Sequence, residues 1–159
     1  MRRLALVSIC LVGLSCGGQG SDPAQVQSEP SEAKTNPCLL LESRTVEGVT
    51  GSKVVSKQRV SSMDSPNAKP LCSYEVGEPF GSVTVYLNPA GKAEFRKRFN
   101  AEDESTEPIP DIGDLAYLRG GNSAHALIGP AYVGVSTQYY TGEASEVVKE
   151  LLRRAITSL

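Results

Sequence analysis

Thiol chemistry is the main reactive chemistry that this sequence offers, because its 159 residues include four cysteines and a single histidine. The cysteines are Cys10, Cys16, Cys38 and Cys72. A thiol can be acylated, can pair with a second thiol in a disulfide, or can bind a metal as the thiolate. Which of these applies depends on the compartment that the chain reaches and on the residues around each cysteine.

The first 15 residues have the order of an export signal. Arg2 and Arg3 precede an apolar run from Leu4 to Leu14. Basic residues, then apolar residues, then small residues are typical of a signal peptide. The apolar run is too short to cross a bilayer as a stable helix, which needs about 20 residues. We therefore expect residues 1–15 to be a signal peptide that carries Cys10 away with it.

The residues that follow, Ser15-Cys16-Gly17-Gly18, resemble the lipobox of bacterial lipoproteins. In that family the signal is cut before the cysteine, whose thiol then carries a diacylglyceryl group. The resemblance implies that Cys16 is lipidated, with acyl chains such as palmitate. Two or more acyl chains hold a protein stably on a membrane, whereas one binds reversibly. The alternative is an ordinary secretory signal cut near Ser15 or Gly20, which would leave the protein secreted.

Composition divides the rest of the chain into a tether and one domain. Residues 16–35 are rich in Gly, Ser, Pro, Gln and Glu, so we expect a disordered tether. Residues 36–159 suit a single small domain. The formal charge of −2 becomes −4 without Arg2 and Arg3, and no basic patch is evident, so nucleic acid is not an expected partner. If the cell has an outer membrane, Gly17 after the lipidated cysteine favours sorting there, by analogy with known lipoproteins.

The last two cysteines remain as a pair in an exported chain. In an oxidising compartment a disulfide between Cys38 and Cys72 is the default. The weaker alternative is a metal or redox pair, for which the sequence has neither a CxxC spacing nor a histidine nearby.

No group of residues forms a recognisable catalytic or cofactor motif. The only histidine, His125, is expected in a short strand, opposite in phase to Ala124 and Ala126. A histidine without a ligand or carboxylate at a suitable spacing is weak evidence for a metal or a general base. GxSxG, HExxH and Walker sequences are absent. We expect no catalytic residue, no metal and no cofactor, and therefore no enzyme.

Hydrophobic periodicity predicts the elements that position these residues. Helices are expected over about 37–48, 89–99 and 143–158, the first two opened by Asn36-Pro37 and Asn88-Pro89. Strands are expected over 53–63, 71–76, 82–87, 115–119, 124–128 and 131–140, with an acidic loop over 100–113. The last helix carries an apolar stripe from Ala144 to Leu159 that should face a core.

These elements predict an α+β fold with the order α-βββ-α-βββ-α. Short turns at 120–122 and 129–130 indicate hairpins, so the sheet should be largely antiparallel, with the helices packed on one face.

Four short motifs give the domain a family resemblance. They are Asn36-Pro37-Cys38 with Leu40-Leu41, Cys72-Ser73-Tyr74, Ile112-Gly113-Asp114-Leu115-Ala116-Tyr117, and the closing amphipathic helix. Together they resemble the DUF3558 group of small exported bacterial lipoproteins of unknown function, over about residues 36–159. The resemblance implies a Cys38–Cys72 disulfide and a location in the cell envelope. It supplies no catalytic residue.

Two functions are compatible with these expectations. The first is a lipid-anchored accessory module of the envelope that contacts another envelope protein through a surface patch. The second is a carrier of a small molecule or lipid in the periplasm or at the cell surface. A carrier would need an apolar cavity of roughly a few hundred Å³ under the helices.

Overall fold

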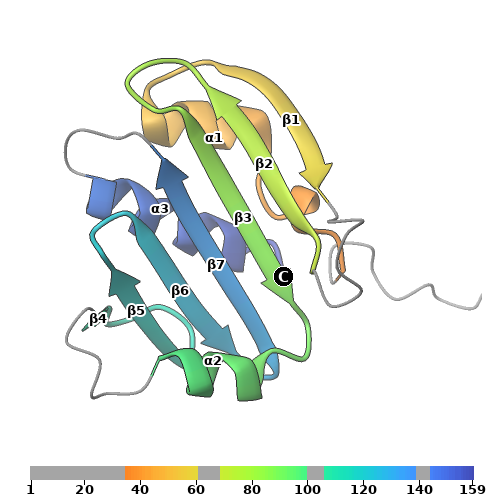
Figure 1. Ribbon diagram of the computed structural model, residues 1–159, viewed down its shortest axis with the longest axis vertical. Coiled ribbons are helices and arrows are strands. Elements are labelled where there is room, and N and C mark those ends of the chain that lie inside the picture. The colour runs from red at the N-terminus through yellow and green to blue at the C-terminus, as the bar shows by residue number, and fades with distance from the viewer. Residues whose placement is uncertain (1–34, 61–68, 100–105, 139–143) are drawn as a thin grey trace, which may run out of the picture.

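The computed structural model describes residues 35–60, 69–99, 106–138 and 144–159 (Figure 1). Three α-helices and a seven-stranded antiparallel sheet form one α+β unit, so the expected fold class is confirmed. In chain order the elements are η2 (Pro37–Leu39), α1 (Ser43–Thr50), β1 (Val54–Val60), β2 (Leu71–Val76), β3 (Ser82–Asn88), α2 (Lys92–Arg98), β4 (Thr106–Pro108), β5 (Leu115–Arg119), β6 (Ser123–Ile128), β7 (Ala131–Gln138) and α3 (Ala144–Ile156).

The sheet joins two meanders through its central strands. Its strand order is β1-β2-β3-β7-β6-β5-β4, so β3 pairs with β7 although more than forty residues separate them in the chain. Glycines make the hairpin between β5 and β6, where Gly120 and Gly121 have φ values of 59° and 73°. Positive φ at two successive turn residues matches the right-handed twist of the paired strands. Figure 1 shows the resulting twisted sheet, with β7 near its centre.

Helices α1 and α3 cover one face of the sheet and bury the main core. The apolar stripe of α3 faces inward as expected, with Val148, Leu151 and Leu152 each 0 % exposed. The strands meet it with alternate side chains, among them Val85 and Val133. This alternation follows from the period-two geometry of a strand, which sends every second side chain to the same face.

Helix α2 packs on the opposite face, which corrects the expectation that all helices share one face. Its Phe95 and Phe99 form a second core with Leu127 of β6 and Tyr132 of β7. These two strand residues are out of phase with Ala126 and the other main-core residues of the same strands. Both faces are therefore apolar at this end of the sheet, and a helix is needed on each side to bury them.

The opening helix differs from the expected range of 37–48. Asn36 does accept a hydrogen bond from the backbone N–H of Cys38, with proline at the next position, but this cap starts only the short 3₁₀ turn η2. The α-helix begins at Ser43. The carbonyl of Leu41 explains the break, because it accepts side-chain hydrogen bonds from β1 and β2 and is not part of a helical ladder.

The second helix begins at Lys92 rather than at residue 89. Asn88 still pairs with Tyr132 in the β3–β7 ladder, and its side-chain oxygen accepts from the N–H of Ala90 in a tight turn. The helix cap is Gly91, with no side-chain cap bond. A β-carbon at Gly91 would lie 2.5 Å from Cβ of Tyr132, so this position allows the turn to approach β7 closely.

The expected loop over 100–113 contains a seventh strand. β4 has only three residues and pairs with β5, from Thr106 opposite Arg119 to Pro108 opposite Tyr117. Three residues are too few to display a period-two pattern, so the sequence carried no signal for it. The other strands lie where they were predicted, although residues 61–63 and 139–140 fall outside the described part of the chain.

Candidate functional site

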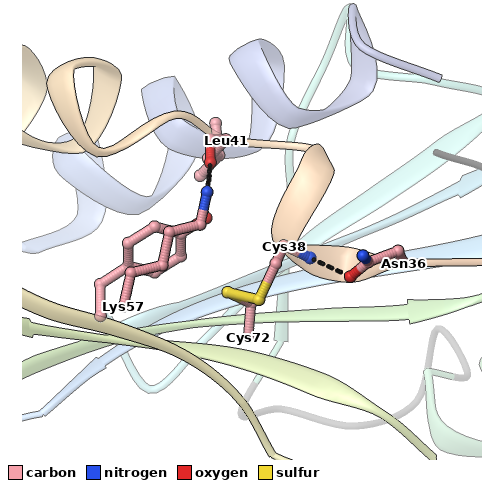
Figure 2. The surroundings of a disulfide bond; sticks show 6 residues. Asn36, Cys38, Leu41, Lys57 and Cys72 are labelled. Atoms are coloured by element: carbon pink, nitrogen blue, oxygen red, sulfur yellow. Dashed lines mark hydrogen bonds between the residues drawn. A yellow bond between two sulfur atoms is a disulfide. The ribbon is translucent and has the colours of Figure 1, made fainter. Parts of the chain in front are cut away.

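The predicted disulfide joins the opening turn to the sheet. Cys38 of η2 is bonded to Cys72 of β2, with 4.9 Å between their Cα atoms, and Cys72 is fully buried. Figure 2 shows the bond reaching from the turn capped by Asn36 down to the strand. The prediction for this pair is confirmed, and the metal or redox alternative is not needed.

Two side chains of the sheet, Lys57 and Tyr74, hold the backbone of Leu41 beside the disulfide, and we call these three residues the clasp. The carbonyl oxygen of Leu41 accepts hydrogen bonds from the Tyr74 hydroxyl at 2.6 Å and from the Lys57 ammonium at 2.9 Å (Figure 2 draws the lysine bond). The ammonium nitrogen also lies 5.3 Å from the centre of the Tyr74 ring, within cation–π distance. Burial raises the pKa of Tyr74, which keeps its hydroxyl protonated as a donor. Disulfide and clasp together hold the turn against β1 and β2.

The proposed lipidation residue, Cys16, lies outside the described residues, as do Cys10 and the expected tether up to residue 34. Within the ranges that are described, no helix is long and apolar enough to span a membrane. Nor do three or more histidine, cysteine, aspartate or glutamate side chains gather there in a way that could hold a metal ion. Of the acidic loop residues, Glu102, Asp103 and Glu104 are also outside the described part, and so is the predicted strand end Tyr139-Tyr140.

A second polar cluster, which the sequence did not predict, surrounds His125 on the face of the sheet opposite α1 and α3. Its Nδ1 lies 2.9 Å from the hydroxyl oxygen of Tyr132, and its Nε2 lies 2.6 Å from Oγ of Ser123. Arg98 of α2 donates an N–H to the same tyrosine oxygen at 3.2 Å. All four groups are satisfied when Tyr132 accepts from Arg98 and donates to Nδ1, while Nε2–H donates to Ser123.

The environment of His125 keeps its ring neutral. Burial, followed by the positive charges of Arg98 and Arg119, lowers its pKa to about 4. A general base works best with a pKa near the operating pH and a free nitrogen. Here both ring nitrogens are engaged, so the geometry favours a structural role for this residue.

Glu94 of α2 forms a second set of hydrogen bonds between this helix and the sheet. Its carboxylate accepts hydrogen bonds from the hydroxyl of Tyr86, the side-chain amide of Asn88 and the ammonium of Lys69. Burial tends to raise the pKa of Glu94, but these three donors together hold it below its ordinary value. The carboxylate is therefore charged at neutral pH and already committed to partners within the fold.

A row of polar side chains crosses the same face from one edge region to the other. Directly paired residues of neighbouring strands point to the same side of a sheet. The ladders align one polar residue from each of six strands, in the order Gln58, Ser73, Thr84, Ser136, Ser123 and Arg119. At the usual strand spacing the row is about 24 Å long. We call it the polar row; every member is exposed or half-buried.

A cavity of about 180 Å³ opens where the polar row meets α2. Its lining includes Thr84, Tyr86, Arg98, His125, Tyr132 and Ser136. Since a water molecule occupies about 30 Å³ in the liquid, the cavity has room for a ligand of only a few non-hydrogen atoms. It is a small site with aromatic walls, into which a few polar side chains from three elements converge.

Comparisons with known proteins add little to this geometry. No family model matches the sequence, and no curated protein matches it. Among solved structures, the chain is similar to a GTP binding regulator from Thermotoga maritima, with a TM-score of 0.39 and 14% sequence identity. That likeness covers 76% of this chain and 92% of the other. We draw no functional argument from it.

Proposed function

We propose that this chain is a lipid-anchored protein of the bacterial cell envelope whose single domain is a non-catalytic interaction module. In this proposal Cys16 carries the lipid, residues 16–35 tether the domain, and the domain contacts another envelope protein. The export signal and the lipobox-like residues support the anchor. The polar row on the sheet face opposite α1 and α3 is the observation that supports the interaction surface.

The shape of that face favours a broad contact. Ser73, Thr84 and Ser136 are short side chains, so a partner can approach the strands closely along the row. Their hydroxyls can donate and accept hydrogen bonds to the partner or to interfacial water, which interfaces use routinely. Arg119 adds a charged group at one end of the row. A sheet face with mostly short polar side chains along six strands suits docking of a partner protein.

The alternative, a carrier of a small molecule or lipid, has less support. A carrier of this fold would use the space between the sheet and helices α1 and α3. That space is filled by side chains of the main core, including Val83, Val133 and Leu151, each 0 % exposed. Dense packing of this kind is typical of an interior that leaves few voids larger than a water molecule.

Metabolic labelling tests the anchor. Cells expressing the wild-type chain, Cys16→Ala and Cys10→Ala are grown with a clickable analogue of palmitate. We expect label on the wild type and on Cys10→Ala, and none on Cys16→Ala, because only Cys16 follows the small residue at the cleavage position. Equal labelling of all three chains, or of none, would contradict the anchor.

Site-specific crosslinking in cells tests the interaction surface. A photoreactive residue is placed at Ser136 in the polar row and, as a matched control, at exposed Arg153 on α3. We expect a defined heavier adduct from position 136 and a much weaker one from position 153. If neither position gives an adduct, and native mass spectrometry of the full chain finds a co-purified small molecule, the carrier alternative replaces this proposal.

A further inference from the structure

We propose that the cavity between α2 and the polar row binds a carboxylate group. The inference goes beyond the interaction module, because a binding pocket for an anion does not depend on how the chain is anchored or on which protein it meets. Three properties of the cavity support it: its hydrogen-bond donors, its charge and its size.

The donors converge from three elements. Arg98 of α2 gives one N–H to Tyr132, and a guanidinium has five, so donors remain for a ligand. Thr84 of β3 and Ser136 of β7 are direct cross-strand partners and both line the cavity. Neither hydroxyl has a hydrogen-bond partner within the described residues, so both can donate hydrogen bonds to a ligand.

A positively charged side chain, Arg98, lies in the wall of the cavity. Arg98 lines the cavity, and Arg119 is near enough to lower the pKa of His125 together with it. His125 itself is neutral, so it adds no charge at pH 7. The nearby carboxylate of Glu94 is already held by Lys69, Tyr86 and Asn88. Arg98 is therefore the charged group that a ligand in the cavity would meet directly.

Size and shape select the class of anion. A planar guanidinium can pair with both oxygens of a carboxylate through two parallel hydrogen bonds. One lining arginine matches the single negative charge of a carboxylate better than the nearly double charge of a phosphate. A volume of about 180 Å³ leaves room for a short group attached to the carboxylate, against Tyr86 and Tyr132. The carboxylate could belong to a small free acid or to the C-terminus of a partner chain.

The experiment is an NMR titration of the full chain, labelled with nitrogen-15 and purified in detergent. Sodium acetate is added at constant ionic strength, with chloride as the replaced anion. We expect saturable shifts of the Arg98 side-chain N–H and of the Thr84 and Ser136 amides. Arg98→Gln should weaken acetate roughly tenfold or more, since a hydrogen bond to a charged group contributes that much. Arg96→Gln, which removes an equal charge from the same helix outside the cavity, should leave the affinity within about twofold.

Two further titrations identify the class and the source. Inorganic phosphate should bind more weakly than acetate; tighter binding of phosphate would overturn the carboxylate assignment. A short peptide with a free C-terminus is compared with its amidated form and with acetate. If the free peptide binds more tightly than both, the source of the carboxylate is the end of a chain. Binding of acetate alone identifies a small acid. No saturable shift with acetate, or an equal loss in Arg98→Gln and Arg96→Gln, would overturn the proposal and leave the interaction module standing.

Discussion

The imidazole of His125 occupies the space in front of Gly134, its cross-strand neighbour on β7. A β-carbon built on Gly134 would lie 2.8 Å from Nδ1 of His125 and 3.3 Å from Cε1. Because Nδ1 also faces the hydroxyl of Tyr132 at 2.9 Å, the ring cannot move aside without losing that contact. The glycine is therefore part of the polar cluster, although it has no side chain of its own.

Gly134→Ala should destabilise the fold by about 1–3 kcal/mol, the usual range for overpacking a closely packed site. The measurement is the free energy of unfolding from urea denaturation followed by circular dichroism. The control is Gly48→Ala on α1, where an added β-carbon would meet nothing within 4 Å; we expect it to be neutral or to stabilise by up to about 1 kcal/mol.

A double mutant identifies the histidine as the cause. In a His125→Ala background, Gly134→Ala should cost much less than in the wild type, because the ring that it would clash with is gone. Equal costs in the two backgrounds would show that the strain at Gly134 has another origin.

Acid should weaken the fold through His125. Its pKa is about 4 in the folded chain and near 6.5 when unfolded, so both states are neutral at pH 7. Between pH 6.5 and 4 the unfolded chain binds the proton first, and stability falls as the pH falls, by at most about 1.4 kcal/mol per pH unit from this group. His125→Gln should lose this component, seen as a shallower fall in the free energy of unfolding over the same range.

The ring protons of His125 give a direct check by NMR, since the chain has one histidine. We expect a titration midpoint well below 6.5 in the folded protein. A midpoint at or above 6.5 would contradict the half-buried, neutral ring and its place between Tyr132 and Ser123.

The two donors on the carbonyl of Leu41 should contribute unequally. Tyr74 is fully buried, so Tyr74→Phe removes a buried hydrogen bond and should cost about 1–2 kcal/mol. Lys57 is exposed on edge strand β1, so Lys57→Met should cost less than about 1 kcal/mol. Thermal and urea unfolding of both variants measure the difference; a larger loss from Lys57→Met would contradict this order.

The disulfide should contribute about 3–4 kcal/mol, because it closes a loop with a sequence separation of 34. Thiol titration of the unfolded, unreduced chain should find neither Cys38 nor Cys72 reactive. The variant with both cysteines changed to alanine should unfold at a lower urea concentration, whereas adding reductant should not affect that variant further. Reactive thiols at both Cys38 and Cys72 in the unreduced wild type would exclude the bond.

Local patterns in the sequence were enough for most of the elements and for the disulfide. The period-two spacing of Val83, Val85 and Leu87 predicted both the strand β3 and the face that it buries. The apolar stripe of α3, at helical spacing, likewise predicted that helix and its buried face. The pairing of Cys38 and Cys72 was predicted because they are the two cysteines of the expected domain. These inferences succeed because each depends on neighbours in the chain or on a simple count.

The tertiary structure alone decided where distant residues meet. The strand β4 was too short to be recognised, and the side of the sheet taken by α2 depended on apolar residues of β6 and β7 in the opposite phase. The polar row exists only because the β3–β7 register sets Thr84 opposite Ser136, while Tyr132 reaches His125 only across the β6–β7 pair. Register and helix placement are set by long-range packing, which leaves no local mark in the order of the residues.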